Sequence, residues 1–211
     1  MSIFKANERP PSWCELENFE IFDLTLSESV EQQVRSPKER LLIAAGTVQL
    51  LIGEGSLLLK ENQFYDLPTC SAWTLRGASA AAQVVRLSGR WGRELGGCGI
   101  FRVENVEHPI HIGDAVSYPK TTTVDPHYHD CDEYWIVLEG SGTVVVGTKT
   151  VKAGPGECVP IGMGHHHDMA TVDFPIKAVF FETTLEGLKR TGHLWNHTHG
   201  PAQPQPERAW R

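Results

Sequence analysis

Short apolar segments recur along the whole chain and are separated by Gly, Pro, Asp or Asn. These segments cover residues 19–26, 40–44, 48–52, 56–60, 83–87, 134–138, 143–146 and 176–182. Helical periodicity is weak and is visible only in residues 185–190. Short apolar runs bounded by turn residues at such spacing are typical of the strands of a β-sandwich or β-barrel. We therefore predict an all-β protein.

The chain also contains an internal repeat. The segment from Glu133 to Gly140 matches the segment from Glu39 to Gly46, and both continue through an apolar strand to a further glycine. Farther along, Pro160 matches Pro68 at nearly the same offset. Two matches in the same order predict two copies of one β unit.

Glycine and proline positions suggest where these copies begin and end. Residues 89–99 are rich in glycine and are expected to join the two halves. The last residues contain three prolines, which argue against regular structure there. We predict a first half over residues 1–92, a second half over 93–186 and a C-terminal tail over 187–211.

A cluster of metal-ligand residues lies in the second copy. His127 and His129 are two residues apart, so on a strand both imidazoles face the same side. Glu133 follows after a short turn, and His165 follows a turn that contains Pro160. Three imidazoles and one carboxylate suit a divalent transition metal such as Fe, Mn, Ni, Co, Cu or Zn. Four protein ligands on a six-coordinate ion leave two positions for water or substrate.

These two stretches resemble the paired motifs of the cupin superfamily. The pattern HxHx3Ex6G is complete, and its fixed positions are His127, His129, Glu133 and Gly140. The pattern Gx5PxGx2Hx3N is met except at its last position, where Met169 replaces Asn; its other positions are Gly154, Pro160, Gly162 and His165. The resemblance covers residues 98–186 and implies a double-stranded β-helix, or jelly-roll, barrel that holds the metal inside.

The first copy lacks the metal ligands. Glu39 is present, but Gln33, Arg35 and Trp73 stand where the second copy has its three histidines. A guanidinium and an indole do not bind a metal ion, so we expect this half to be metal-free. It would serve as a scaffold or an interface.

Two residues beside the ligand positions are candidates for the pocket. His167 lies two residues after His165 and should face the same side, where it could act as a general acid or base or form part of the wall. Trp135 shares the strand face of Glu133 and could line a substrate pocket or serve in packing. The tail histidines His193, His197 and His199 are expected to be exposed or to fold over a neighbouring surface.

Charge and cysteine content narrow the function further. The 211-residue chain has a formal net charge of −7 and a pI near 5.8, which argues against nucleic acid or anionic membrane as partners. Five cysteines without CxxC pairing suggest reduced thiols and a cytoplasmic protein. The sheet edges predict a homodimer.

We expect an enzyme that isomerises or epimerises a small oxygen-rich substrate, which is either sugar-like or a hydroxy or keto acid. A dioxygenase that uses Fe or Mn and a metal- or ligand-sensing protein are the alternatives.

Overall fold

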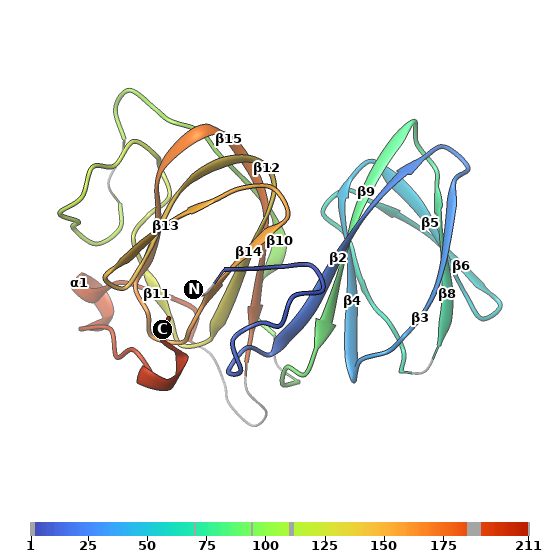
Figure 1. Cartoon of the computed structure of the whole chain (residues 1–211), viewed down its shortest axis with the longest axis horizontal. Helices are drawn as coiled ribbons and strands as arrows, with labels where there is room; N and C mark the ends of the chain where they lie inside the picture. Colours follow the sequence, from blue (N-terminus) through green and yellow to red (C-terminus); the bar gives the residue numbers. More distant parts are fainter. Residues whose placement is uncertain (1–2, 70, 94, 110–111, 185–190, 211) are drawn as a thin grey trace. The chain divides into compact units, whose positions relative to one another are not determined.

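β-Strands make up most of the protein (Figure 1). The computed structural model describes residues 3–69, 71–93, 95–109, 112–184 and 191–210. The segment 185–190, where the sequence shows weak helical periodicity, lies outside these residues. The all-β prediction is confirmed.

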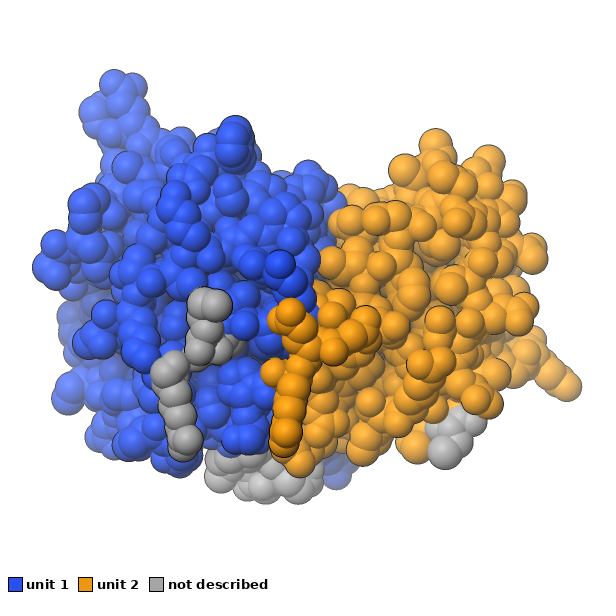
Figure 2. Space-filling view, in the orientation of Figure 1, with its two compact units in different colours: residues 1–5, 10–15, 92–211 blue, residues 6–9, 16–91 orange. Residues whose placement is uncertain are grey.

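The chain divides into two compact units (Figure 2). Unit 1 contains Met1–Lys5, Pro10–Glu15 and Gly92–Arg211, and unit 2 contains Ala6–Arg9 and Leu16–Trp91. Strand β1 (Phe4–Lys5) pairs with β14 (Glu157–Ile161) of unit 1, where Phe4 is buried. Residues 3–5 and 10–15 therefore pack in unit 1, and the domain boundaries expected from the sequence stay a prediction.

Unit 2 is a sandwich of two four-stranded antiparallel sheets. One sheet has the order β2 (Leu16–Thr25), β9 (Ala81–Gly89), β4 (Lys38–Ala45) and β7 (Phe64–Asp66). The other has the order β3 (Ser29–Gln33), β8 (Ala72–Gly77), β5 (Thr47–Ile52) and β6 (Gly55–Lys60). Strand alternation turns one face of each sheet inward, so that residues such as Ile43, Leu50 and Leu75 form the buried core.

Unit 1 contains a six-stranded antiparallel sheet and a small two-stranded one. The large sheet has the order β1, β14, β12 (Asp132–Val146), β15 (His167–Thr183) and β10 (Cys98–Val103), and β13 (Lys149–Ala153) also pairs with β12. The small sheet joins β11 (Tyr128–His129) to β16 (His193–Leu194). The core of unit 1 is formed by apolar side chains of β12, β14 and β15, including Val137, Val159 and Ala178.

The described residues form the β-rich fold that the sequence predicts, and their sheets are open and do not close into a barrel. The register of the β12–β15 pairing shifts several times between Val137 and Val144. Such β-bulges bend the paired strands. Gly140 lies in this stretch with a φ of +75°, and a Cβ there would collide with the carbonyl of Pro175. The fold is therefore jelly-roll in character, but its sheets stay open.

The C-terminal residues are more regular than the sequence predicts. After β16, residues Asn196–His199 form the short helix α1 and Pro206–Arg208 form a 3-10 helix. Arg208 is buried, and its guanidinium contacts the carboxylates of Glu15 and Asp132. This ion pairing ties the C-terminal segment to unit 1, which the proline content of the sequence does not reveal. None of the helices among the described residues has the length and apolar character needed to cross a membrane.

Candidate metal centre

Four ligand-type side chains meet inside unit 1. They are His127, His129, Glu133 and His167, and each offers one donor atom within 4.8 Å of the others. All four are buried. His129 lies on β11, Glu133 lies on β12 and His167 begins β15, while His127 directly precedes β11. The structure thus brings together three of the four ligands expected from the sequence.

The remaining expected ligand, His165, does not belong to this group. Its backbone lies in a turn in which Gly164 has a φ of +77°, and its Nε2 lies 3.1 Å from the carbonyl oxygen of Gln205. His167 takes its place because its backbone pairs with that of His127 in both directions, with N···O distances of 2.8 and 3.2 Å. Residues directly opposite in an antiparallel pair project to the same face. The turn after Pro160 is therefore two residues longer than the motif spacing assumes.

Hydrogen bonds set the orientation of two of the imidazoles. Nδ1 of His127 lies 2.6 Å from the carbonyl oxygen of Asp125, and Nδ1 of His167 lies 2.9 Å from that of His165. A carbonyl oxygen only accepts, so both Nδ1 atoms carry the proton. The Nε2 atoms of both rings are left with lone pairs, which is the form that binds a metal.

Glu133 supplies the negative charge of the group. Its Oε2 lies 2.9 Å from Nε2 of His167 and 3.3 Å from Nδ1 of His129. Oε2 of Glu133 and Nε2 of His167 are both buried and make no hydrogen bond of suitable geometry with any residue that the structure describes. Polar atoms are seldom buried without a partner, and converging lone pairs are what a bound cation would satisfy.

Burial and mutual proximity set the charge state of these groups. Burial, together with the neighbouring His167 and His129, lowers the pKa of His127 to about 2. Burial also lowers the pKa of His167. Burial raises the pKa of Glu133, but His129 and His167 outweigh that effect and hold it well below its usual value. The lowered pKa values favour neutral imidazoles at His127 and His167 beside an ionised Glu133, which are the protonation states that metal binding requires. The donor set therefore fits a divalent transition metal.

Trp135 and Glu182 border the centre. Trp135 is 3% exposed, packs against Phe101 and meets the His167 ring edge-on at 5.4 Å. It therefore belongs to the core and also forms one wall beside a ligand-type residue. Glu182, which the sequence analysis does not single out, places Oε1 3.5 Å from Nε2 of His129 and accepts a hydrogen bond from the Gly97 amide.

The C-terminal segment reaches this centre through His193. The imidazole of His193 stacks on that of His127 with ring centroids 3.5 Å apart, and its Nε2 lies 2.8 Å from Oδ2 of Asp125. Asp125, His127 and His193 also form a second group of metal-ligand type. Of the other tail histidines, His197 contacts Asp114 and His199 accepts a hydrogen bond from the Trp195 amide. The sequence offers no signal for Asp125, and only the clustering of histidines for His193.

Unit 2 also buries a glutamate, but with a different partner. Glu39 on β4 is 2% exposed, and both its oxygens accept hydrogen bonds from the Arg86 guanidinium at 2.8 Å. Arg86 also donates to Glu20 and to the carbonyl oxygen of Gln33, and its guanidinium carbon lies 5.4 Å from the Trp73 ring centroid. A bidentate guanidinium neutralises a buried carboxylate with good geometry. The buried charge of Glu39 is thus balanced by a side chain.

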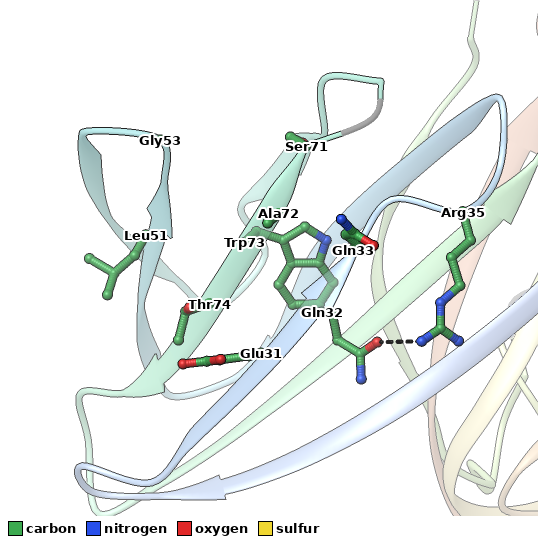
Figure 3. A pocket seen from close by; sticks show the side chains of 10 residues that line it. All are labelled: Glu31, Gln32, Gln33, Arg35, Leu51, Gly53, Ser71, Ala72, Trp73 and Thr74. Carbon is green, nitrogen blue, oxygen red and sulfur yellow. Dashed lines mark hydrogen bonds between the residues drawn. The ribbon is translucent and has the colours of Figure 1, made fainter.

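The residues that the repeat aligns with the three histidines line a hollow of about 770 Å³ in unit 2 (Figure 3). Gln33, Arg35 and Trp73 all border it, and Arg35 hydrogen-bonds Gln32 at 3.5 Å. Trp73 itself is buried and meets Phe22 edge-on. None of these three side chains supplies a carboxylate, imidazole or thiolate, so they offer no metal-ligand set.

Comparison with known proteins points to one fold family. A family model described as a cupin domain matches residues 116–181, which include all four clustered residues. The chain is 49% identical over 210 residues to the uncharacterized protein y4oW of Sinorhizobium fredii, with 99% of this chain and 96% of that protein covered.

Solved structures share the fold at low sequence identity. Vicilin from Corylus avellana (hazelnut) matches with a TM-score of 0.57 and 9% identity, over 89% of this chain and 81% of that one. Oxalate decarboxylase from Bacillus subtilis, whose Mn(II) centres have been characterised, matches with a TM-score of 0.57 and 10% identity, over 90% of this chain and 74% of that one. At such identities the likeness concerns the fold alone.

Proposed function

The chain belongs to the cupin superfamily, and on that premise we propose that it is an enzyme that holds one divalent transition-metal ion through His127, His129, Glu133 and His167. The observation that carries the proposal is the convergence of four buried donor atoms on one point. The substrate we propose is a small oxygen-rich molecule, either sugar-like or a hydroxy or keto acid. Isomerisation or epimerisation is the proposed reaction.

The donor set supports this metal class and this substrate class. Imidazole and carboxylate ligands suit Mn, Fe, Co, Ni, Cu and Zn, and the Mn(II) centres of the B. subtilis decarboxylase are a precedent on a similar fold. When bound, such an ion supplies Lewis-acid polarisation of a substrate carbonyl or hydroxyl oxygen. A substrate with two neighbouring oxygens would fit that chemistry.

The protein's own residues would position the reactants and move the proton. Trp135 closes one wall and keeps water from that side of the centre. His167, the sequence-based candidate for acid–base chemistry, turns its Nε2 toward Glu133 and is therefore assigned as a ligand. Glu182 is a buried carboxylate beside the group that is not one of the proposed ligands, and we assign proton transfer to it.

Metal analysis is the first test. Protein purified without a metal-affinity tag should contain one equivalent of a transition metal per chain. His129→Ala removes a direct ligand, and because loss of an orienting partner alone costs about 10- to 100-fold in affinity, this change should cost at least as much. The far-UV dichroism should stay β-type, since unit 1 has its own apolar core. Full metal occupancy in His129→Ala would contradict the proposed ligand set.

A substrate screen with and without oxygen tests the reaction class. Exchange of substrate protons with solvent under anaerobic conditions supports the isomerase or epimerase. Oxygen consumption would instead identify a dioxygenase that uses the same ligands. Binding without turnover across a broad panel of hydroxy acids, keto acids and sugars would identify a sensing protein.

A further inference from the structure

The C-terminal strand β16 places a histidine directly against one of the proposed ligands. In the β11–β16 pair, His193 is the partner of His129 and Leu194 is the partner of Tyr128. The segment is anchored on both sides of this pair. The Asp130 carboxylate accepts hydrogen bonds from the amides of Thr191 and Gly192, and the Tyr128 hydroxyl donates to the carbonyl oxygen of Gly200 at 2.9 Å. His193 is therefore held in position, although its side chain is 39% exposed.

The side chains form a continuous chain of polar contacts. Oδ2 of Asp125 lies 2.8 Å from Nε2 of His193, and Nδ1 of His193 lies 3.4 Å from Nε2 of His129. On the other side of the His129 ring, Nδ1 lies 3.3 Å from Oε2 of Glu133. Asp125 is fixed in turn, because the Trp195 indole donates to its Oδ2 at 2.8 Å.

The Asp125 carboxylate decides which ring nitrogens of His193 and His129 carry a proton. A carboxylate only accepts hydrogen bonds, so Nε2 of His193 must be the donor to Asp125. In a neutral imidazole the other nitrogen is then an acceptor, so Nδ1 of His193 accepts from Nε2–H of His129. His129 is thereby left with its lone pair on Nδ1, the atom that faces Glu133. The Glu182 carboxylate, 3.5 Å from Nε2 of His129, favours the same tautomer.

We propose that Asp125 and His193 are positioning residues of the metal centre, which hold His129 in the tautomer whose Nδ1 binds the ion. The inference rests on the proposed function and adds the C-terminal segment to the site. It also gives the three imidazoles different donor atoms, with Nε2 for His127 and His167 and Nδ1 for His129. Partners that orient a ligand in this way contribute about 10- to 100-fold to metal affinity.

Three variants test the hydrogen-bonded series Asp125–His193–His129, which we call the relay. His193→Leu removes the acceptor for His129, whereas His193→Asn keeps an oxygen close to the position of Nδ1. His199→Leu is the matched control, since His199 lies in the same segment and its side chain contacts the Trp195 amide and indole. Titration of metal-free protein with Mn(II) and Zn(II) in a calorimeter should show a loss of about 10- to 100-fold for His193→Leu. His193→Asn and His199→Leu should bind like the wild type.

A second readout reports on the tautomer without any metal. Long-range ¹H–¹⁵N spectra of the metal-free protein distinguish Nδ1–H from Nε2–H, and they should show Nε2–H for His129 in the wild type and in His193→Asn. His193→Leu should lose that preference. Protection of the Asn196 and His197 amides, measured by hydrogen exchange, shows whether the segment stays docked.

The outcomes separate this inference from the proposed function. If the wild type binds no metal, the proposed function fails, while the ¹H–¹⁵N spectra still decide whether the relay exists. If the wild type binds metal and His193→Leu binds equally well with an unchanged tautomer, the relay is overturned. Equal losses in His193→Leu and His193→Asn would overturn the acceptor role of His193.

Discussion

Two buried glutamates, Glu133 in unit 1 and Glu39 in unit 2, meet the same electrostatic problem in different ways. Each is at most 4% exposed, and an isolated carboxylate is too costly to leave uncompensated at such a depth. Around Glu133 lie three imidazoles, whose ring nitrogens are of metal-ligand type. Around Glu39 the Arg86 guanidinium supplies the positive charge within the chain itself.

The difference separates a centre that could hold a metal ion from one whose charge is already balanced. A guanidinium keeps its proton under all ordinary conditions, so the Glu39–Arg86 pair is complete as folded. In the function proposed above, a bound cation completes the Glu133 group, which is bordered by the polar residues His193 and Glu182. That the two units arose from one repeated unit stays a prediction from the sequence.

The largest expected effect comes from removing the internal cation of unit 2. Arg86→Met would leave Glu39 buried without its partner, and breaking a buried pair in this way costs about 3–5 kcal/mol. Urea denaturation should show unit 2 destabilised by this amount, whereas metal content should stay as in the wild type. Arg40→Met is the control, because its partner Asp66 is 57% exposed and the pair is correspondingly weaker. A loss of metal from folded Arg86→Met protein would contradict the separation of the two centres.

The next largest expected effect is on metal affinity, and it distinguishes His167 from His165. His167→Ala should lower metal affinity by at least 10- to 100-fold, because it removes a direct donor. His165→Ala should change it little, since the His165 ring faces the carbonyl oxygen of Gln205. Metal titration of both variants by calorimetry is the measurement. The reverse ranking would restore the ligand set expected from the motif spacing.

The smallest expected change is in the anchoring of the C-terminal segment, which carries His193 to the Glu133 centre. Burial raises the pKa of Asp114, but hydrogen bonds from the Asn196 amide and from the rings of His197 and His166 outweigh it and lower the pKa to about 2. Because the folded-state pKa is lowered, Asp114 stabilises the segment fully above its ordinary pKa near 4 and loses that effect as the pH falls toward 2.

Asp114→Asn tests this anchoring. At neutral pH, hydrogen exchange at the Asn196 and His197 amides should be about tenfold faster than in the wild type, since a hydrogen bond to a charged group contributes about 1.5 kcal/mol. The difference should hold down to about pH 5 and vanish near pH 2. A difference that persisted unchanged at pH 2 would show that the charge of Asp114 is not its cause.

The sequence by itself determined the strand content and three of the four clustered residues. Alternation along a strand has a period of two residues, so the shared face of His127 and His129 follows from their spacing alone. Glu133 follows after a short turn, so its place in the motif HxHx3Ex6G predicts it rather than strand alternation. The apolar segments likewise locate most strands, because the pattern that predicts a strand lies within the strand.

The tertiary structure decided everything that depends on pairing between distant segments. His167 rather than His165 joins the centre because its backbone pairs with His127, and the sequence does not specify that register. Arg86 meets Glu39 because β9 lies beside β4, and His193 meets His129 because the C-terminal segment returns to β11. The physical reason is that a one-residue change of register turns every side chain of a strand to the opposite face, and only the packing of the complete unit selects among the registers.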